Sequence, residues 1–241
     1  DSSFHCPTSP KQAVTISDGM PEPSVMASTP NRDNAFIETP EPTVSPVFHH
    51  KLDNDSSVDN ASDTNKNRVV FIGDSLSSRV SADALSNSTQ ATVDIQSIAW
   101  RVNNATNFVE NLQTNNKIDL LVVHTGTNDL PCEEACDTIR KLRRLEDTLK
   151  LSNIQNIALS SICYRKQFKY RTKTRLVNSA ISLICARNKW TFIDNDNIDA
   201  QCLIKDGVHF NNKGIDIFTR NIQNGIKNEL GFYQNAGTID I

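Results

Sequence analysis

The chain has 241 residues, a formal net charge of −3 and 37% hydrophobic residues, enough for one sizeable domain with an added segment or for two small domains. No stretch approaches the roughly 18 apolar residues of a membrane span, so no such span is expected. The first residues lack the basic and apolar regions of a signal peptide, which favours an intracellular location.

Proline and charge divide the chain. Eight of the nine prolines lie within the first 46 residues, and residues 1–66 carry ten acidic and four basic side chains, a charge of −6 that leaves about +3 on the rest. This segment has too few apolar residues to offset its chain entropy. We therefore expect a disordered tail or linker over 1–66, a folded domain over 67–232 and a flexible tail over 233–241. The nearly neutral domain favours neither nucleic-acid nor membrane binding.

The cysteines argue against a disulfide framework and against a metal centre. All six are dispersed along the chain, unlike those of small disulfide-rich domains. Cys132 and Cys136 are four residues apart, but no further Cys/His pair has the spacing that would complete a metal site. We expect free or structural thiols, no metal and no cofactor.

Strand and helix patterns alternate from Arg68 onward. Short runs of β-branched and aromatic residues predict five strands, at Arg68–Ile72, Thr92–Ile95, Ile118–His124, Ile154–Leu159 and Trp190–Ile193. Helical patterns lie between and after them, at 75–85, 103–114, Asp137–Lys150, 172–188 and Asn212–Leu230. This alternation predicts right-handed crossovers and a parallel sheet covered on both faces.

Polar segments follow three of the predicted strands. Gly-Asp-Ser-Leu stands at 73–76 after the first strand, and Gly-Thr-Asn-Asp stands at 126–129 after the third. Asp-Gly-Val-His stands at 206–209, between the fifth strand and the last helix. Because ligands of such folds bind beyond the carboxyl ends of the strands, these segments are expected to form one site.

Their side chains suit nucleophilic catalysis. Ser75 would start a helix, with an unpaired N–H and a dipole that favours developing negative charge. A serine hydroxyl needs a base, which His209 can supply, and Asp206 can orient the imidazole from its other nitrogen. The Asn128 amide is a donor of the kind that holds an oxyanion, together with the N–H of Ser75.

These segments, in this order and at these places, resemble the blocks of the SGNH (GDSL-like) hydrolase superfamily over about residues 68–230. The resemblance implies a three-layer α/β/α domain with a five-stranded parallel sheet, the flavodoxin-like SGNH hydrolase fold. It also implies an esterase with a catalytic triad of Ser75, Asp206 and His209 that cleaves carboxylic esters, with acetyl esters as a candidate. Longer runs such as Leu-Val-Val-His-Thr-Gly-Thr-Asn-Asp-Leu are similar to SGNH domains of invertebrate genomes, some of them associated with retroelements.

The chain departs from the family at the second block. That block normally offers a glycine whose backbone N–H is another oxyanion donor, but residues 97–106 contain no glycine. Trp100 or a neighbour occupies the place. Because every residue except proline has a backbone N–H, we expect the N–H of Trp100 to complete the oxyanion hole, while close substrate approach is put in doubt.

A basic stretch over 164–175 holds six basic residues, three aromatic residues and no acid. Three interpretations are open for this stretch. It is either a solvated loop, or one wall of a site for an anionic substrate with Arg165 and Lys166 as contacts, or a nucleic-acid contact. His124, at the end of a strand, is expected to be a packed residue.

Two functions remain open. The first is a serine hydrolase that cleaves small-molecule or acylated esters through an acyl-enzyme intermediate. The second is an SGNH-fold binding module for RNA or protein with weak or no catalysis. The intact Ser, Asn, Asp and His residues favour the hydrolase, whereas the altered second block and the basic stretch favour the binding module.

Overall fold

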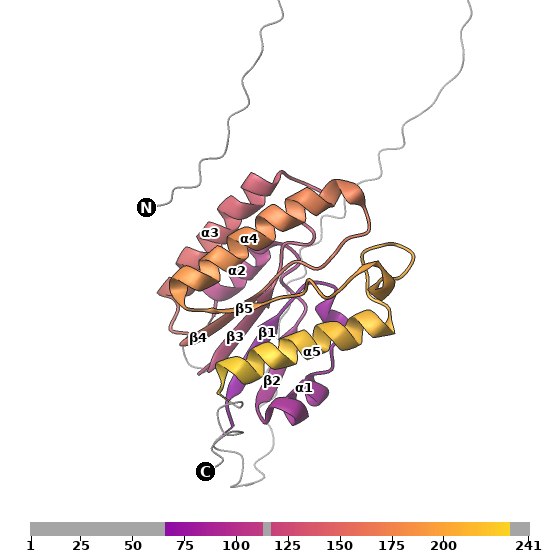
Figure 1. Cartoon of the computed structure of the whole chain (residues 1–241). Coiled ribbons are helices and arrows are strands. Elements are labelled where there is room, and N and C mark those ends of the chain that lie inside the picture. Colours follow the sequence, from indigo (N-terminus) through magenta and orange to yellow (C-terminus); the bar gives the residue numbers. More distant parts are fainter. Residues whose placement is uncertain (1–65, 113–116, 232–241) are drawn as a thin grey trace, which may run out of the picture. The chain divides into compact units, whose positions relative to one another are not determined.

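A computed structural model describes residues 66–112 and 117–231 (Figure 1). Within these residues, five parallel strands form one sheet in the order β2-β1-β3-β4-β5, as in flavodoxin-like folds. The strands are β1 Arg68–Ile72, β2 Thr92–Gln96, β3 Leu120–His124, β4 Asn156–Ser160 and β5 Thr191–Ile193. The tails predicted over 1–66 and 233–241 lie outside the described residues, except for Lys66.

Helices cover both faces of this sheet. They are α1 Ala82–Thr89, α2 Val102–Glu110, α3 Ala135–Leu151, α4 Arg171–Asn188 and α5 Asn212–Glu229. Helices α2, α3 and α4 pack on one face, and α1 and α5 pack on the other (Figure 1). The predicted three-layer α/β/α fold with a five-stranded parallel sheet is therefore confirmed.

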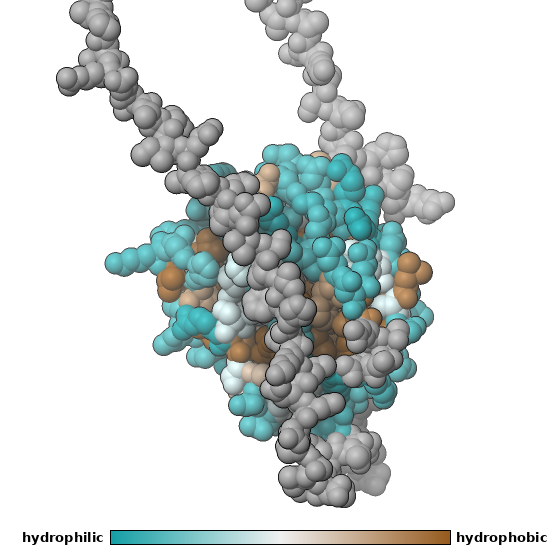
Figure 2. Space-filling model, turned by 180° about the vertical axis from the view of Figure 1, so that it is seen from behind, coloured by the Kyte–Doolittle hydropathy of each residue, from teal (hydrophilic) through white to brown (hydrophobic). Residues whose placement is uncertain are grey.

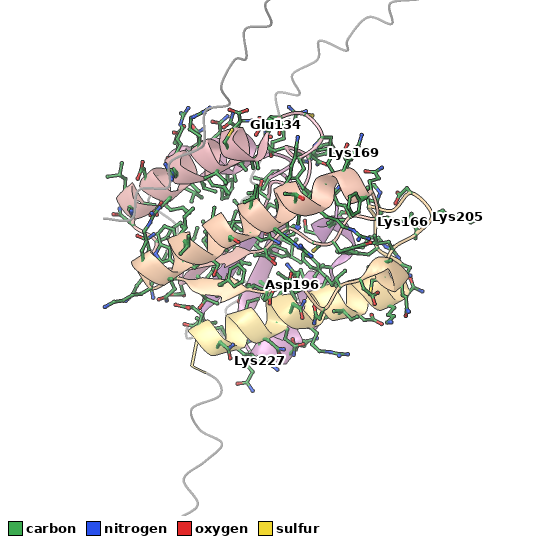
Figure 3. The ribbon with its side chains drawn as sticks, turned by 45° about the horizontal axis from the view of Figure 1, so that its top comes forward. Glu134, Lys166, Lys169, Asp196, Lys205 and Lys227 are labelled. Atoms are coloured by element: carbon green, nitrogen blue, oxygen red, sulfur yellow. The ribbon has the colours of Figure 1, made fainter. Side chains whose placement is uncertain are left out.

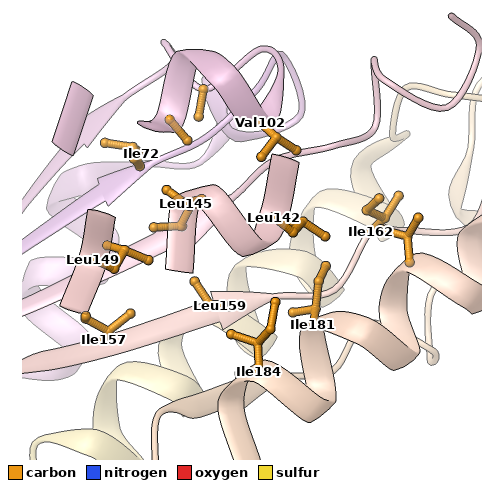
Figure 4. Packing of buried hydrophobic residues seen from close by; sticks show 14 of the residues in the cluster. Ile72, Val102, Leu142, Leu145, Leu149, Ile157, Leu159, Ile162, Ile181 and Ile184 are labelled. Carbon is orange, nitrogen blue, oxygen red and sulfur yellow. The ribbon is translucent and has the colours of Figure 1, made fainter. Parts of the chain in front are cut away.

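The alternation of side chains along the strands separates two hydrophobic cores. In β1, Val70 and Ile72 face α2–α4, whereas Val69 and Phe71 face α1 and α5. Every residue of β3 is buried, as a strand between two others and two helical layers requires. Figure 4 shows the first core, where strand residues meet α3 and α4 through Leu142, Leu145, Leu149, Ile181 and Ile184.

The helix predicted over 75–85 is wrong at its start. After β1 the chain makes only a short 3₁₀ turn at Ser77–Arg79 and extends at Val80. Helix α1 begins at Ala82, and its N-cap Ser81 accepts the backbone N–H of Ala84 at 3.2 Å. Ser75 therefore lies in a turn, and the dipole of an α-helix does not act on it.

Side chains of the turn itself prevent an earlier helix. The Asp74 carboxylate accepts the backbone N–H of Leu76 at 2.8 Å, and the Ser77 hydroxyl donates to the Asp74 carbonyl at 2.8 Å. Such local bonds offer the backbone partners other than those of a helix. Asp74 and Ser77, the short polar residues on either side of Ser75, are thus the reason that α1 begins only at Ala82.

Hydrophilic residues cover much of the rim that Figure 2 shows from behind, and hydrophobic residues gather nearer the middle of that face. No helix in the described ranges is long and apolar enough to cross a membrane. The buried apolar residues lie in the two cores between the sheet and its helices.

A buried carboxylate joins α3 to α4. The Glu146 side chain is 2% exposed and accepts hydrogen bonds from Arg187, from Asn188 at 2.7 Å and from Lys150 at 2.7 Å. Burial alone would raise the pKa of Glu146, but these donors outweigh it and lower the pKa to about 2. The charged form is therefore the form that the fold stabilises.

We expect Glu146→Gln to destabilise the domain in a pH-dependent way. Because the pKa of Glu146 falls from 4.5 to about 2 on folding, its contribution is complete above pH 4.5 and is lost as the pH falls toward 2. Urea unfolding at pH 7 should show that the variant loses about 1–3 kcal/mol of the free energy of unfolding. This loss is smaller than for a fully buried ion pair because the partners of Glu146 are partly exposed. The loss should shrink near pH 3. Glu110→Gln, which breaks an exposed pair with Arg144, is the control. A loss independent of pH would contradict the prediction.

Candidate active site

Ser75, His209 and Asp206 lie together at the carboxyl edge of the sheet. Ser75 follows β1, and the other two precede α5. The Ser75 Oγ lies 3.3 Å from the His209 Nε2, and the His209 Nδ1 lies 2.6 Å from the Asp206 Oδ2. Residues 134 positions apart in the sequence thus form one chain of hydrogen bonds.

The Asp206 carboxylate determines how the imidazole is protonated. Its other oxygen accepts the backbone N–H groups of Val208 at 2.8 Å and His209 at 2.9 Å. The bond to the His209 side chain, followed by these two, lowers the pKa of Asp206 to about 2. A carboxylate at the Nδ1 side assigns the proton of a neutral imidazole to Nδ1, which leaves the Nε2 lone pair for the Ser75 hydroxyl.

A tight loop holds His209 in place. The backbone N–H of Ile204 donates to the His209 carbonyl at 2.8 Å, and Leu203 pairs with Phe210 in an antiparallel bridge. Gly207 has a φ of +73°, and a Cβ there would lie 2.7 Å from the Lys166 Cβ. Glycine is therefore required both by the turn and by the segment packed against it.

The Ser75 turn is tied to the loop after β2. The Gly73 N–H donates to the Gln96 carbonyl at 3.0 Å, and the Ala99 N–H donates to the Gly73 carbonyl at 2.9 Å. A Cβ on Gly73 would lie 2.4 Å from the Ser77 Oγ, so a side chain would push the turn apart. Within the described residues, nothing accepts the Ser75 N–H, which is thus available to a ligand.

A buried polar network lies beneath this turn. His124 is fully buried, as the sequence predicts, and burial lowers its pKa, so it is neutral. Its Nδ1 lies 3.1 Å from the Ser160 Oγ, which accepts the Asn195 amide at 2.8 Å. Because Ser160 then has His124 as the acceptor for its own proton, the His124 N–H falls on Nε2, 3.9 Å from the Asp74 carboxylate.

Sequence reasoning did not identify Asn195 in this network. It accepts the Asn221 side-chain amide at 3.0 Å and so links α5 to β4. The polar run over 194–197 directly follows β5, so the rule that selected the other segments would also have selected this one.

The Gly-Thr-Asn-Asp loop presents Asn128 from a buried frame. Asn128 is the one residue between Leu120 and Leu130 that is not buried. The Asp129 carboxylate accepts the Val102 N–H at 3.0 Å and the Lys141 ammonium at 3.1 Å. Among the described residues, the Asn128 side-chain amide has no hydrogen-bond partner. The loop is thus held by its neighbours and leaves this amide unused.

Trp100 lies in the loop after β2, where the sequence predicts that it or a neighbour stands in place of the family glycine. Its indole N–H donates to the Ser97 carbonyl at 2.7 Å, and the residue is 58% exposed. No acceptor for its backbone N–H is present in the described part of the chain. The adjacent Ala99 carbonyl accepts the Thr125 hydroxyl at 2.9 Å, so this loop is joined to the one that carries Asn128.

The basic stretch divides into engaged and exposed residues. Arg165 is only 8% exposed and donates to the Thr127 carbonyl at 2.7 Å. Arg171 donates to the Tyr164 hydroxyl at 2.8 Å. Lys166 is exposed, on the same side of the domain as Lys205 (Figure 3). Of the two predicted substrate contacts, Lys166 lies at the surface and Arg165 lies beneath it.

His209 and Asp206 lie on an open surface. About half of each of these two side chains is exposed, 49% for His209 and 43% for Asp206, whereas Ser75 is partly buried. A cavity of about 900 Å³ opens between α4 and the segment after β5, with Arg175 and Asp194 in its wall, and its lining does not include Ser75, Asp206 or His209. Within the described ranges, no three His, Cys, Asp or Glu residues gather as metal ligands would.

No protein-family model and no curated protein matches the sequence. The structure is similar to a catalytic mutant of Axe2, an acetylxylan esterase from Geobacillus stearothermophilus, with 17% identity and a TM-score of 0.55 over 66% of this chain and 94% of that one. It is also similar to a carbohydrate acetylesterase family member from Sinorhizobium meliloti, with 16% identity and a TM-score of 0.57 over 68% of this chain and 99% of that one. A lipolytic G-D-S-L family protein from Veillonella parvula is similar with 15% identity and a TM-score of 0.54, over 70% of this chain and 98% of that one.

At these identities, the likeness shows the fold alone. The domain has the fold of GDSL-type esterases, as the sequence motifs predict. The chain spans nearly the whole length of these proteins, 94–99%. The similarity to invertebrate retroelement domains stays a sequence resemblance.

The geometry predicts an unusually acidic Asp206. In ¹³C NMR, its carboxyl carbon should titrate near pH 2. His209→Ala removes the largest cause of the lowered pKa, so the midpoint should move toward 3.8. Lys205→Ala, a neighbouring exposed change outside this hydrogen-bond chain, should leave the midpoint where it is. An Asp206 that titrates near 3.8 in the unmodified protein would show that the imidazole is elsewhere.

Proposed function

We propose that this domain is a serine hydrolase that cleaves carboxylic esters, acetyl esters among them, through an acyl-enzyme intermediate. The observation that carries the proposal is the hydrogen-bond chain from Ser75 through His209 to Asp206, with distances of 3.3 and 2.6 Å. Ser75 is the nucleophile, His209 the general base and Asp206 the group that orients and stabilises the imidazole.

The reaction uses each of these groups in turn. His209 takes the Ser75 proton as Oγ attacks the ester carbonyl, and the carbonyl oxygen becomes an oxyanion. The N–H groups of Ser75 and Trp100 and the Asn128 amide hold this oxyanion. Its collapse expels the alcohol, which receives the proton from His209. Water, activated by the same imidazole, then releases the acid from Ser75.

Two observations support a small acyl group on a larger alcohol. His209 and Asp206 are about half exposed on an open surface, which leaves room for the alcohol portion of a large substrate. The structurally similar proteins include an acetylxylan esterase and a carbohydrate acetylesterase. Lys166, exposed next to Gly207, is the candidate contact for an anionic group on the substrate.

One observation favours a binding module as the second candidate. Phe168 is 79% exposed, the Arg171 guanidinium lies 5.4 Å from its ring, and Lys166 and Lys169 are exposed beside it. Aromatic and cationic side chains of this kind stack on bases and pair with phosphates. RNA or an acidic protein segment would then be the partner, and ester turnover would be weak or absent.

A fluorophosphonate should label the unmodified protein at Ser75. Ser75→Ala should lose both the label and ester turnover, because among the described residues no other hydroxyl is hydrogen-bonded to the base. Ser78→Ala is the matched control, since the Ser78 hydroxyl is exposed and donates to the Ser75 carbonyl at 2.7 Å without reaching His209. Labelling of another serine, found by mass spectrometry, would refute the assignment; no labelling at all would favour the binding module.

Asn128→Ala should lower turnover by about 10²–10³-fold, the usual effect of removing one oxyanion donor. Labelling of Ser75 should remain detectable because the nucleophile and its base are untouched. Steady-state kinetics on p-nitrophenyl acetate measure the first effect, and probe labelling measures the second. A variant with full turnover would remove Asn128 from the oxyanion hole.

A further inference from the structure

We propose that Arg165 is a positioning residue that sets the Asn128 amide for the oxyanion, an inference that rests on the proposed esterase function. The sequence suggested Arg165 as a substrate contact, but the residue is 8% exposed. It follows β4 and lies under the site, with its guanidinium turned to the Gly-Thr-Asn-Asp loop.

The decisive contact is a hydrogen bond to the peptide that carries Asn128. Arg165 Nη1 donates to the Thr127 carbonyl at 2.7 Å. That carbonyl and the backbone N–H of Asn128 belong to one planar peptide, so the bond restricts rotation on the N-terminal side of Asn128. On the C-terminal side, the Asp129 carboxylate is bonded to the Val102 N–H at 3.0 Å. Asn128 is therefore held from both sides, while its own amide stays unused.

Stability alone does not account for a charge at this place. Burial lowers the pKa of the Arg165 guanidinium, whereas Tyr170, Asp74 and Asp206 raise it. The guanidinium lies 5.0 Å from the Tyr170 ring centre, yet its Nε has no hydrogen-bond partner among the described residues. A buried cation with an unsatisfied donor destabilises the folded state, and an apolar side chain of similar size would fill the same space without this desolvation cost.

The same arginine links the two halves of the site. It lies close enough to Asp206 and Asp74 for both carboxylates to affect it electrostatically. The backbone N–H of its neighbour Lys166 donates to the Gly207 carbonyl at 3.0 Å, in the loop that holds His209. The segment after β4 thus contacts both the His209 loop and the Asn128 loop, and Arg165 supplies its bond to the latter.

The test is a double-mutant cycle on the full chain with p-nitrophenyl acetate. Arg165→Met keeps the apolar stem and removes the donor, and should lower kcat by about 10- to 100-fold with little change in KM, because a small misplacement weakens the oxyanion contact. In an Asn128→Ala background, the same change should cost less than about 3-fold, since both act through one amide. Arg165→Lys should recover part of the loss. Lys169→Met, which removes an exposed cation also 5.0 Å from the Tyr170 ring, is the matched control.

A second measurement does not depend on activity. The side-chain amide resonance of Asn128, assigned by its loss in Asn128→Ala, should shift in Arg165→Met and stay in place in Lys169→Met. If the unmodified protein turns over ester but the losses from Arg165→Met and Asn128→Ala multiply, or the resonance does not move, the positioning role is overturned and the esterase stands. If the resonance moves while the unmodified protein neither reacts with the ester nor takes a fluorophosphonate, the esterase function fails instead. Should Arg165→Met not fold, Arg165→Lys carries the same cycle and resonance test.

Discussion

The parallel pairing of β1 with β2 and β3 is the constraint on which the site depends. In this register, Ile72 lies opposite Gln96 on one side and Val123 on the other. Because parallel strands end at the same edge, the segments that follow these three residues emerge as neighbours. Those segments carry Ser75, Trp100 and Asn128, and the loop before α5 brings His209 to the same edge. Without that pairing, the segments that carry these residues would not leave the sheet at the same edge.

Hydrogen bonds between loops convert this rough proximity into a defined geometry. Gly73 is bonded to the loop after β2, and that loop is bonded to Thr125. Arg165 holds the Thr127 carbonyl from below, and Asp206 holds the backbone of its own turn. The bonds of Gly73, Thr125 and Arg165 join segments far apart in sequence, whereas the Asp206 bonds are local and exposed. Those of Thr125 and Arg165 are buried, where such bonds are strong and their loss is costly. The positions of Ser75, Asn128 and His209 therefore depend on contacts made by other residues.

Under the proposed function, the absence of a second-block glycine would have a limited effect for a physical reason. What that block would contribute is a backbone N–H, and Trp100 still has one that no described residue accepts. Its indole is bonded to the Ser97 carbonyl in its own loop. The Trp100 side chain thus leaves this backbone donor in place. The open surface around His209, 49% exposed, accommodates such an addition more easily than an enclosed pocket would.

The sequence by itself determined the strands and the layers, and it selected Ser75, His209 and Asp206, which the structure brings together. Strand β1 matches its predicted bounds, and β3 begins two residues later than predicted, because short apolar runs report burial locally. Only the tertiary structure decided what depends on partners distant in sequence. The helix expected from residue 75 starts at Ala82, since Asp74 and Ser77 bond to the turn backbone. Likewise, Arg165 is buried under the Asn128 loop although the residues that follow it, Lys166 and Gln167, are polar and exposed. Periodicity in the sequence shows which face of an element is buried. The hydrogen-bond partner of a polar side chain instead depends on which loop the tertiary fold packs against it.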